Sequence, residues 1–382
     1  MASLCKKLLS RIILFCFFIS ILSVPTKVNA QIPSLSAKSA IVICADNGKV
    51  LYGKNEKEPR PMASTTKIMT ALLTLEAAEK EDTNVTITDK MVPVDGSSMY
   101  LQVGQVLPLS SLAKGMLTVS GNDAANSAAI ALCGSVDAFV ELMNKKASQI
   151  GMLDTVFETP SGLDKGDHHS TAYDMALLGA YALENQAFYD ISSKKSVEVP
   201  FVKPDEIRTL YNENRMLKRY DGCIGIKTGF TRLAGRCLVS AAERNNTRLV
   251  AVTLNAPDDW NDHEKLLDYG FSQVETVVFG NKDYAILPLV GGDANEISAF
   301  VKDKISISVR KGDKDKIKKV VEVPPFLYAP LKQGQVVGKV KYQVDGDVLA
   351  SNDLIVEKDV PVTKPNKGLW KKLSDIFMGI FN

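Results

Sequence analysis

The chain has 382 residues, of which 45% are hydrophobic and 24% are charged, and this composition excludes an intrinsically disordered protein. Its formal net charge of +2, with basic residues scattered along the sequence, gives no whole-chain attraction to nucleic acid, so we expect no nucleic-acid partner. The length allows one large domain or two to three smaller ones.

A secretory signal peptide is predicted at residues 1–30. Three basic residues precede the apolar run IILFCFFISIL, and the small residues of VNA place a cleavage point after Ala30. A retained membrane anchor is the alternative, but the apolar run at residues 12–22 is shorter than the roughly 20 residues that a spanning helix needs. We therefore expect the mature protein to be exported.

Residues 31–283 are predicted to form an α+β catalytic domain. SAIVICADNGKVLYGKNE indicates two strands around an Asn-Gly turn. Helical spacing follows in KIMTALLTLEAAEK, SLAKGMLTVSGNDAANSAAIALC and VDAFVELMNKKASQIGM. Strand character returns in DGCIGIKTGF and in AGRCLVSAAERNNTRLVAVTLNA, which is typical of a hairpin around Asn245-Asn246. Strands at both ends of a helical middle predict one antiparallel sheet with a helical subdomain.

Two further segments are predicted after this domain. Residues 284–362 alternate short strand-like runs with Gly-Asp and Asp-Gly turns, which predicts a small all-β sandwich. Residues 363–382 include LWKKLSDIFMGIF, an amphipathic helical pattern with lysines on one face and Trp and Phe on the other. Such a helix suits the surface of a membrane, here the outer face of the cytoplasmic membrane, and docking on its own domain is the alternative.

Four cysteines, Cys44, Cys133, Cys223 and Cys237, remain after the predicted signal. They are too dispersed for a disulfide scaffold, and they form no C-x-x-C metal pair. Small buried apolar residues are the favoured interpretation for most of them. A Cys223–Cys237 disulfide, another pairing or none stays open, because sequence gives no distance.

Ser64 and Lys67 stand three residues apart where the first helical pattern begins, so both would lie on one face of its first turn. A lysine buried beside a hydroxyl can lose its proton and act as the base of a serine nucleophile. The alternative is an ordinary N-cap serine and a solvated lysine. Ser-x-x-Lys alone does not decide between them, because four other serines of this chain have the same spacing.

Two more motifs follow Ser-x-x-Lys. SGN, starting at Ser120, lies in a small-residue stretch between two helices, and KTG, starting at Lys227, lies on a predicted strand. Taken singly, Asn122 could cap a helix beginning near Asp123, Thr228 could favour a strand, and Lys227 could be solvated. Taken together with STTK, in this order, they match Ser-x-x-Lys, Ser-x-Asn and Lys-Thr-Gly of the penicillin-binding proteins and serine β-lactamases.

The chain resembles the low-molecular-weight penicillin-binding proteins that are serine-type D-alanyl-D-alanine carboxypeptidases of peptidase family S11. The resemblance extends to PSGLD and HHSTAYDMA and covers the chain from about Ala40 to the C-terminus. It implies a penicillin-binding-protein/β-lactamase-like transpeptidase fold, followed by the β-sandwich and the amphipathic tail. It also implies a peptidoglycan stem peptide ending in D-Ala-D-Ala as substrate, β-lactams as covalent inhibitors, and a place at the cell wall.

The resemblance assigns a role to each motif residue. Ser64 would attack the carbonyl between the two terminal D-alanines, Lys67 would take its proton, and water would hydrolyse the acyl-enzyme. Ser120 would relay a proton to the leaving amine, and Asn122 would hold the backbone amide of the substrate. Lys227 and Thr228 would bind the terminal carboxylate, and Gly229 would let the strand edge approach the substrate closely. The backbone N–H groups of Ser64 and Phe230 would form the oxyanion hole.

Three other functions are possible alternatives. A class A serine β-lactamase would carry a Glu-x-x-Leu-Asn type motif between Asn122 and Lys227, and there is none. A non-catalytic wall-binding or β-lactam-sensing module would not need the Ser64, Lys67 and Ser120 set. A zinc peptidase would have to be built from three histidines without a His-Glu-x-x-His motif, so we expect no metal and no cofactor. Two of these, His168 and His169, are expected to order a loop near the cleft.

Overall fold

The computed structural model describes residues 32–280 and 284–363. The predicted signal peptide at 1–30 and, apart from its first residue, the predicted membrane-surface helix at 363–382 lie outside these ranges. Within them no single helix has the length and apolar character to cross a membrane, and one pair of helices bent by 88°, Asn122–Cys133 with Val136–Ile150, passes the same criteria on length and composition only.

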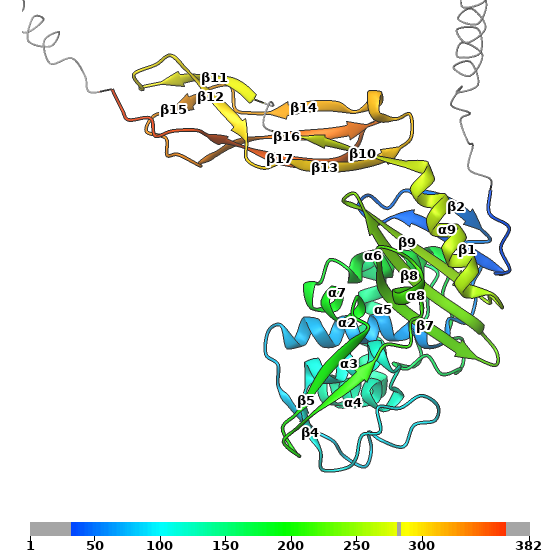
Figure 1. The fold of residues 1–382 in the computed structure, drawn as a ribbon. Coiled ribbons are helices and arrows are strands. Elements are labelled where there is room, and N and C mark those ends of the chain that lie inside the picture. The colour runs from blue at the N-terminus through cyan, green and yellow to red at the C-terminus, as the bar shows by residue number, and fades with distance from the viewer. Residues whose placement is uncertain (1–31, 281–283, 364–382) are drawn as a thin grey trace, which may run out of the picture. The chain divides into compact units, whose positions relative to one another are not determined.

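An antiparallel five-stranded sheet lies at the centre of the first part of the chain (Figure 1). Its strands, in spatial order, are β2 (Val50–Lys54), β1 (Ser39–Cys44), β9 (Thr247–Leu254), β8 (Gly235–Arg244) and β7 (Cys223–Thr231). Strands from both ends of this part therefore share one sheet, as the sequence predicted, and both predicted hairpins form. β7, the strand with the Lys-Thr-Gly motif, is an edge strand.

Helices pack on both faces of this sheet. On one face, a Cβ at Gly179 of α6 (Ala172–Ala182) would lie 3.1–3.2 Å from side-chain atoms of Val250, Ile226 and Val239. On the other face, a Cβ at Gly270 of α9 (Asp259–Gln273) would lie 2.7 Å from the Leu249 side chain. The absence of a side chain lets each helix approach the strands closely.

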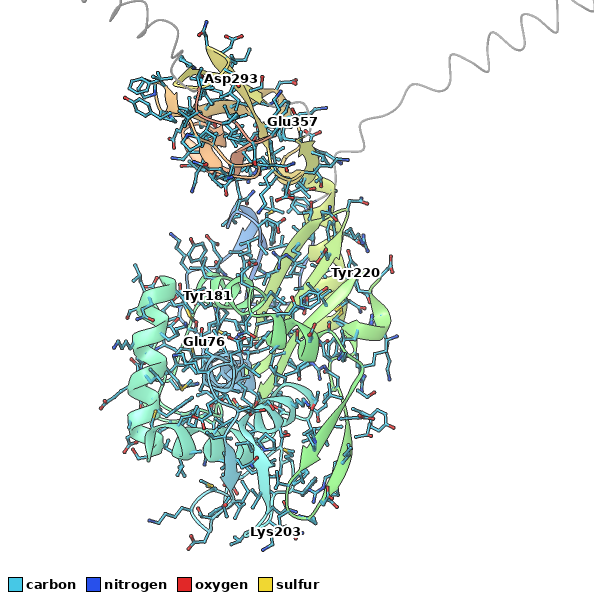
Figure 2. All side chains as sticks on the ribbon, turned by 90° about the vertical axis from the view of Figure 1, so that its left-hand side faces the viewer. Glu76, Tyr181, Lys203, Tyr220, Asp293 and Glu357 are labelled. Atoms are coloured by element: carbon cyan, nitrogen blue, oxygen red, sulfur yellow. The ribbon has the colours of Figure 1, made fainter. Side chains whose placement is uncertain are left out.

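The helical subdomain packs beyond α6. Its elements are η1 (Ala63–Thr66), α2 (Lys67–Ala78), α3 (Leu109–Thr118), α4 (Asn122–Cys133), α5 (Val136–Ile150) and α7 (Gln186–Ser192), with the short strand pairs β3 (Asn84–Thr86) and β4 (Val106–Pro108), and β5 (Ser196–Phe201) and β6 (Glu206–Tyr211). The short helix α8 (Met216–Arg219) packs with α9 instead, since Met216 shares a core with Leu266 and Arg219 bonds Glu264. Every residue of α2 from Lys67 to Leu75 is buried. Near its exposed end, Glu76 forms an ion pair with Lys146, whose ammonium also bonds the hydroxyl of Tyr181 (Figure 2).

The last part of the chain is all-β, which confirms the predicted class. β10 (Val274–Phe279) pairs with β13 (Ile305–Arg310), and a six-stranded sheet has the order β14 (Lys318–Glu322), β16 (Val336–Val344), β17 (Asp347–Val356), β12 (Glu296–Val301), β11 (Tyr284–Val290) and β15 (Leu327–Tyr328). Side chains of both sheets share one core that includes Ile307, Val309, Leu354 and Val356. β10 lies before residue 284, where the predicted sandwich begins, but it pairs with β13, a strand inside the predicted sandwich.

All four described cysteines are free thiols. Cys223 stands opposite Ala242 and Cys237 opposite Gly229, so the β7–β8 register keeps these two cysteines apart. Cys44 and Cys237 are buried, and burial raises the pKa of each thiol to about 12. These two cysteines behave as small apolar core residues.

Candidate active site

Ser64 lies in the 3-10 turn η1, directly before α2, whereas the sequence predicted the first turn of the helix itself. Neither η1 nor α2 has a side-chain cap hydrogen bond, so the N-cap alternative for Ser64 is wrong. The preceding residue, Ala63, has a φ of +49°, in the left-handed region that costs an L-residue roughly 1–2 kcal/mol. The turn that holds Ser64 is therefore locally strained.

Lys67 is 0% exposed, so the solvated-lysine alternative is also wrong. Its Nζ lies 3.0 Å from Ser64 Oγ and donates a hydrogen bond to the carbonyl of Ser161 at 2.6 Å. Burial, and secondly the charge of Lys227, lower the pKa of Lys67 well below its usual value. The arrangement places an amine that loses its proton readily beside a serine hydroxyl.

The PSGLD segment fixes this turn from the other side. Besides the Ser161 carbonyl that holds Lys67, the Pro160 carbonyl accepts from the Thr70 hydroxyl at 2.6 Å. A Cβ at Gly162, where φ is +84°, would lie 2.0 Å from the carbonyl oxygen of Ala63. Only glycine lets the two backbones come this close.

His168 also supports the turn, as the expectation of a loop-ordering role implied. Its Nδ1 accepts the backbone N–H of Glu158 at 2.9 Å, so Nε2 carries the proton and donates to the Thr66 hydroxyl at 2.8 Å. That hydroxyl in turn donates to the carbonyl of Ala63 at 2.8 Å. Burial lowers the pKa of His168 to about 4, which keeps the imidazole neutral.

Ser120 and Asn122 lie where α3 gives way to α4. Ser120 has a φ of +61° and is buried. Asn122 is the first residue of α4 and makes no cap hydrogen bond, so the capping alternative is wrong. Its Nδ2 donates to the carbonyl of Asp95, while its Oδ1, within the described part of the chain, has no partner. Asn122 therefore offers a buried, unused acceptor.

β7 presents the Lys-Thr-Gly motif at the edge of the sheet. Lys227 is 1% exposed, which overturns the solvated alternative, and its Nζ donates to the Thr228 carbonyl at 2.9 Å. Burial lowers the pKa of Lys227 to about 8, against the opposing effect of Glu213. A Cβ at Gly229 would lie 3.0 Å from the backbone nitrogen of Ser64, so glycine brings the strand against the serine turn.

A cleft of about 620 Å³ joins these elements. Five of the predicted residues line it: Ser64, Ser120, Thr228, Gly229 and Phe230. The other three, Lys67, Asn122 and Lys227, are buried and do not line it, but each lies beside a lining residue. Lys67 bonds Ser64, Asn122 is two residues after Ser120, and Lys227 Nζ lies 3.4 Å from the Thr228 hydroxyl. All eight predicted residues thus belong to the cleft or to its immediate support.

Sequence reasoning missed the rest of the lining, which is Ser97, Asn212, Glu213, Arg215, Lys218, Arg236, Asp259 and Trp260. Most of these come from loops and a short helix that carry no motif. Arg236 had a signal, because a hairpin between the two predicted strands places it directly opposite Phe230. The hairpin register could therefore have identified it.

Comparison with known proteins agrees with this geometry. The family model described as D-alanyl-D-alanine carboxypeptidase, peptidase S11, matches residues 26–258. The chain belongs to the D-alanyl-D-alanine carboxypeptidase family. A second model, the C-terminal domain of penicillin-binding protein 5, matches residues 273–362. The resemblance found in the sequence is thus confirmed, and the β-lactamase alternative is not favoured.

Relatives of this carboxypeptidase family match over most of the chain. D-alanyl-D-alanine carboxypeptidase DacF of Bacillus subtilis is 34% identical over 360 residues, which cover 88% of this chain and 90% of that protein. DacA of Escherichia coli K12 is 35% identical, covering 86% and 85%. The solved structure of penicillin binding protein 5 from Haemophilus influenzae has 32% identity and a TM-score of 0.64, covering 87% of this chain and 99% of that one.

Proposed function

We propose that this protein is a serine-type D-alanyl-D-alanine carboxypeptidase that removes the terminal D-alanine from peptidoglycan stem peptides through an acyl-enzyme on Ser64. The single observation that carries the proposal is the 3.0 Å separation between Lys67 Nζ and Ser64 Oγ. Because Lys67 is fully buried, its neutral form is favoured, and a neutral amine can accept the serine proton as the hydroxyl attacks. General-base catalysis of this kind contributes about 10²–10⁴-fold in rate.

The other motif residues supply binding and proton transfer. Ser120 lines the cleft with Ser64 and relays the proton to the leaving amine. The unpartnered Oδ1 of Asn122 accepts the backbone N–H of the substrate. The backbone N–H groups of Ser64 and Phe230 form the oxyanion hole, in which each donor typically contributes about 3 kcal/mol of transition-state stabilisation.

Thr228 and Lys227 receive the terminal carboxylate from β7. Thr228 lines the cleft, while Lys227 lies behind it with its Nζ 3.4 Å from the Thr228 hydroxyl, so its charge acts through that hydroxyl. A β-lactam carries a comparable carboxylate beside a strained amide. It therefore acylates Ser64 as a covalent inhibitor.

The test is intact-protein mass after brief exposure to benzylpenicillin, with D-alanine release from diacyl-Lys-D-Ala-D-Ala followed in parallel. The unmutated protein is expected to gain one penicilloyl adduct and to release D-alanine, because both reactions use the same nucleophile. Ser64→Ala should do neither. Ser97→Ala, which changes a cleft serine outside the motifs, is the matched control and should retain both.

Two outcomes contradict the proposal. A short-lived adduct with little D-alanine release would point to a β-lactamase. An adduct that persists in Ser64→Ala would exclude Ser64 as the nucleophile.

The proposed function also includes two steps of localisation. Residues 1–30 direct export, and residues 363–382 attach the protein to the outer face of the cytoplasmic membrane. The signal pattern and the amphipathic pattern of the sequence support them. The distribution between membrane and soluble fractions after deletion of residues 364–382 tests the attachment.

A further inference from the structure

β14 forms an open edge of the six-stranded sheet in the all-β part of the chain (Figure 1). It pairs with β16 on one side, and no strand in the described part of the chain pairs with its other side. All five residues of β14, from Lys318 to Glu322, are exposed. The outer row of its backbone N–H and C=O groups is therefore available to a strand from another molecule.

The core side of β14 leaves an apolar side chain half exposed. Lys319 and Val321 stand opposite Tyr342 and Val340 of β16, which are buried in the core, so both lie on this side of the sheet. The ammonium of Lys319 lies 5.2 Å from the ring centroid of Phe279, whereas Val321 is 47% exposed. A strand added at this edge would cover Val321.

The outer side of β14 carries opposite charges at its two ends. Because the side chains of a strand alternate, Lys318, Val320 and Glu322 share this side. Lys318 has no ion-pair partner among the residues that the structure describes. Glu322 pairs with Lys341 at 2.7 Å, but its side chain stays 51% exposed, so the carboxylate can accept from a second ammonium.

This pattern is complementary to itself when two copies of β14 pair in antiparallel fashion about Val320. In that register Lys318 of each copy stands opposite Glu322 of the other, and the two Val320 side chains meet at the centre. On the core side, the apolar stem of each Lys319 covers Val321 of the other copy.

Neighbouring registers are less favourable. Pairing about Lys319 would place the two Lys319 side chains opposite each other, and like charges in that position are destabilising. Pairing about Val321 would place Lys318 opposite Pro324, so neither its charge nor the proline backbone would find a partner. Lysines usually protect an edge strand from pairing, and here they restrict the pairing to one register.

We propose that β14 is a self-association surface, through which two copies of this chain form an antiparallel dimer with twofold symmetry. The charges of β14 specify a second copy as the occupant of the edge, and the pairing joins two sheets into one continuous sheet. Five paired residues make a small interface, so the dimer is weak and reversible in solution. This inference goes beyond the proposed function and does not depend on it.

The experiment is disulfide cross-linking of the mature full-length chain in mild detergent, with micelles in excess over protein and copper phenanthroline as oxidant. Val320→Cys should give at least about threefold more covalent dimer than the unmutated chain, because directly opposed residues of antiparallel strands lie within disulfide reach. Lys339→Cys is the matched control. It changes an exposed residue of the same sheet, but β14 and β17 flank it on both sides, so it should not cross-link.

Charge variants of the Val320→Cys chain test the register. Lys318→Glu and Glu322→Lys each place like charges opposite each other, so the yield of dimer should fall by about threefold to tenfold in either variant alone. When the two variants are mixed, each meets the opposite charge in the other. Cross-linking between unlike chains, distinguished by two tags, should therefore recover.

Thermal unfolding of each variant shows whether it is folded. If Val320→Cys is not, a mixture of Lys318→Cys and Glu322→Cys chains decides the question, because the register places these two positions opposite each other. A yield from folded Val320→Cys no greater than from Lys339→Cys would overturn the inference. Charge variants that cross-link as well alone as in the mixture would also overturn it, because the association would then not use this register.

Discussion

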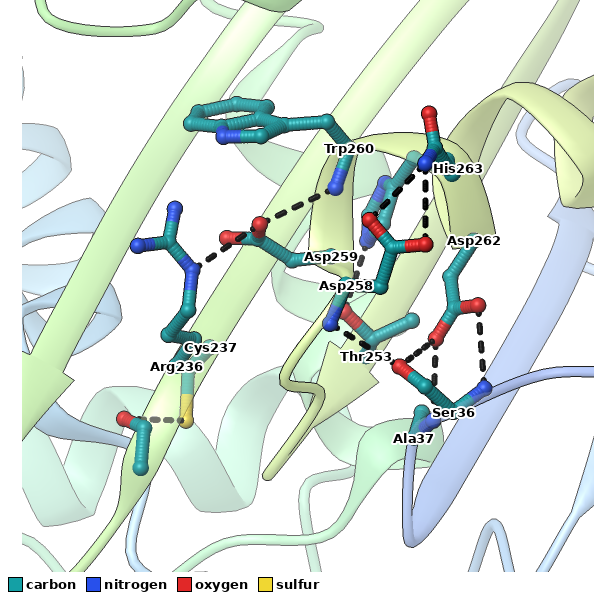
Figure 3. A network of polar contacts seen from close by, with 12 residues as sticks. Ser36, Ala37, Arg236, Cys237, Thr253, Asp258, Asp259, Trp260, Asp262 and His263 are labelled. Carbon is teal, nitrogen blue, oxygen red and sulfur yellow. Dashed lines mark hydrogen bonds and ion pairs between the residues drawn. The ribbon is translucent and has the colours of Figure 1, made fainter.

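His263 is a fully buried histidine in α9, held between two strands of the central sheet (Figure 3). Its Nδ1 lies 2.5 Å from the Ser240 hydroxyl and its Nε2 lies 2.9 Å from the Thr253 hydroxyl. Burial lowers its pKa to about 3, and that of His168 to about 4, both from 6.5. The folded protein therefore holds two imidazoles neutral that the unfolded chain protonates in mild acid.

These two pKa values predict acid sensitivity. Each neutral imidazole contributes its full stability above about pH 6.5 and loses it as the pH falls toward 4, which amounts to about 2 kcal/mol per histidine at pH 5. The free energy of urea unfolding should therefore fall between pH 7 and pH 5. In His263→Gln the fall should be smaller by about 2 kcal/mol, whatever the substitution costs at pH 7. An identical fall in this variant would show that His263 titrates normally in the folded protein.

Close backbone contact between elements is what positions Ser64, the proposed nucleophile. The PSGLD segment, the η1 turn and the edge strand β7 meet around Ser64, through glycines at 162 and 229. Gly162→Ala should lower both stability and kcat/KM, because its Cβ cannot fit against the Ala63 carbonyl. We expect a loss of more than about 2 kcal/mol and at least a roughly tenfold loss of kcat/KM.

Gly151→Ala is the matched control for this substitution. Gly151 also has a positive φ, of +91°, but nothing lies within 4 Å of its Cβ position. It therefore carries the conformational cost of about 1 kcal/mol without the clash, and activity should be retained. Equal losses in the two variants would mean that backbone conformation alone accounts for Gly162.

Sequence patterns predicted the elements that carry strong periodicity or a motif. The buried face of α2, the hairpins at both ends of the central sheet and the three motifs were all identified from the residues. The strained η1 turn was not, because a φ of +49° at Ala63 has no signature in an alanine. Nor was the support from His168, since its hydrogen bond to Thr66 joins residues 102 positions apart.

At the scale of the whole molecule, all residues that line the Ser64 cleft in the described part of the chain come before residue 274. The predicted boundary between residues 283 and 284 stays a prediction, and the pairing of β10 with β13 shows how closely the two parts of the chain join there. The all-β class of the last part of the chain could be predicted from its turns. The cleft lining contributed by Glu213, Arg215 and Trp260 could not, because it depends on how distant segments meet.

Deletion of residues 364–382 tests whether the tail attaches the protein to the membrane without contributing to catalysis in the cleft. We expect the shortened protein to leave the membrane fraction while its kcat/KM for a short soluble peptide stays within about twofold of the full chain, because the described lining of the cleft ends at Trp260. Salt washing of the full chain separates charge attraction from apolar insertion. Persistence of the shortened protein on membranes would contradict attachment through the tail.

The position of β7 at the edge of the central sheet has a consequence for solubility. An unpaired strand edge is also where a strand of a second molecule can add, and uncovered edges of this kind promote aggregation. Here the η1 turn packs against Gly229, and Glu213, Arg215 and Lys218 line the cleft beside the strand. The walls that form a peptide-binding cleft thereby also shield the edge from self-association.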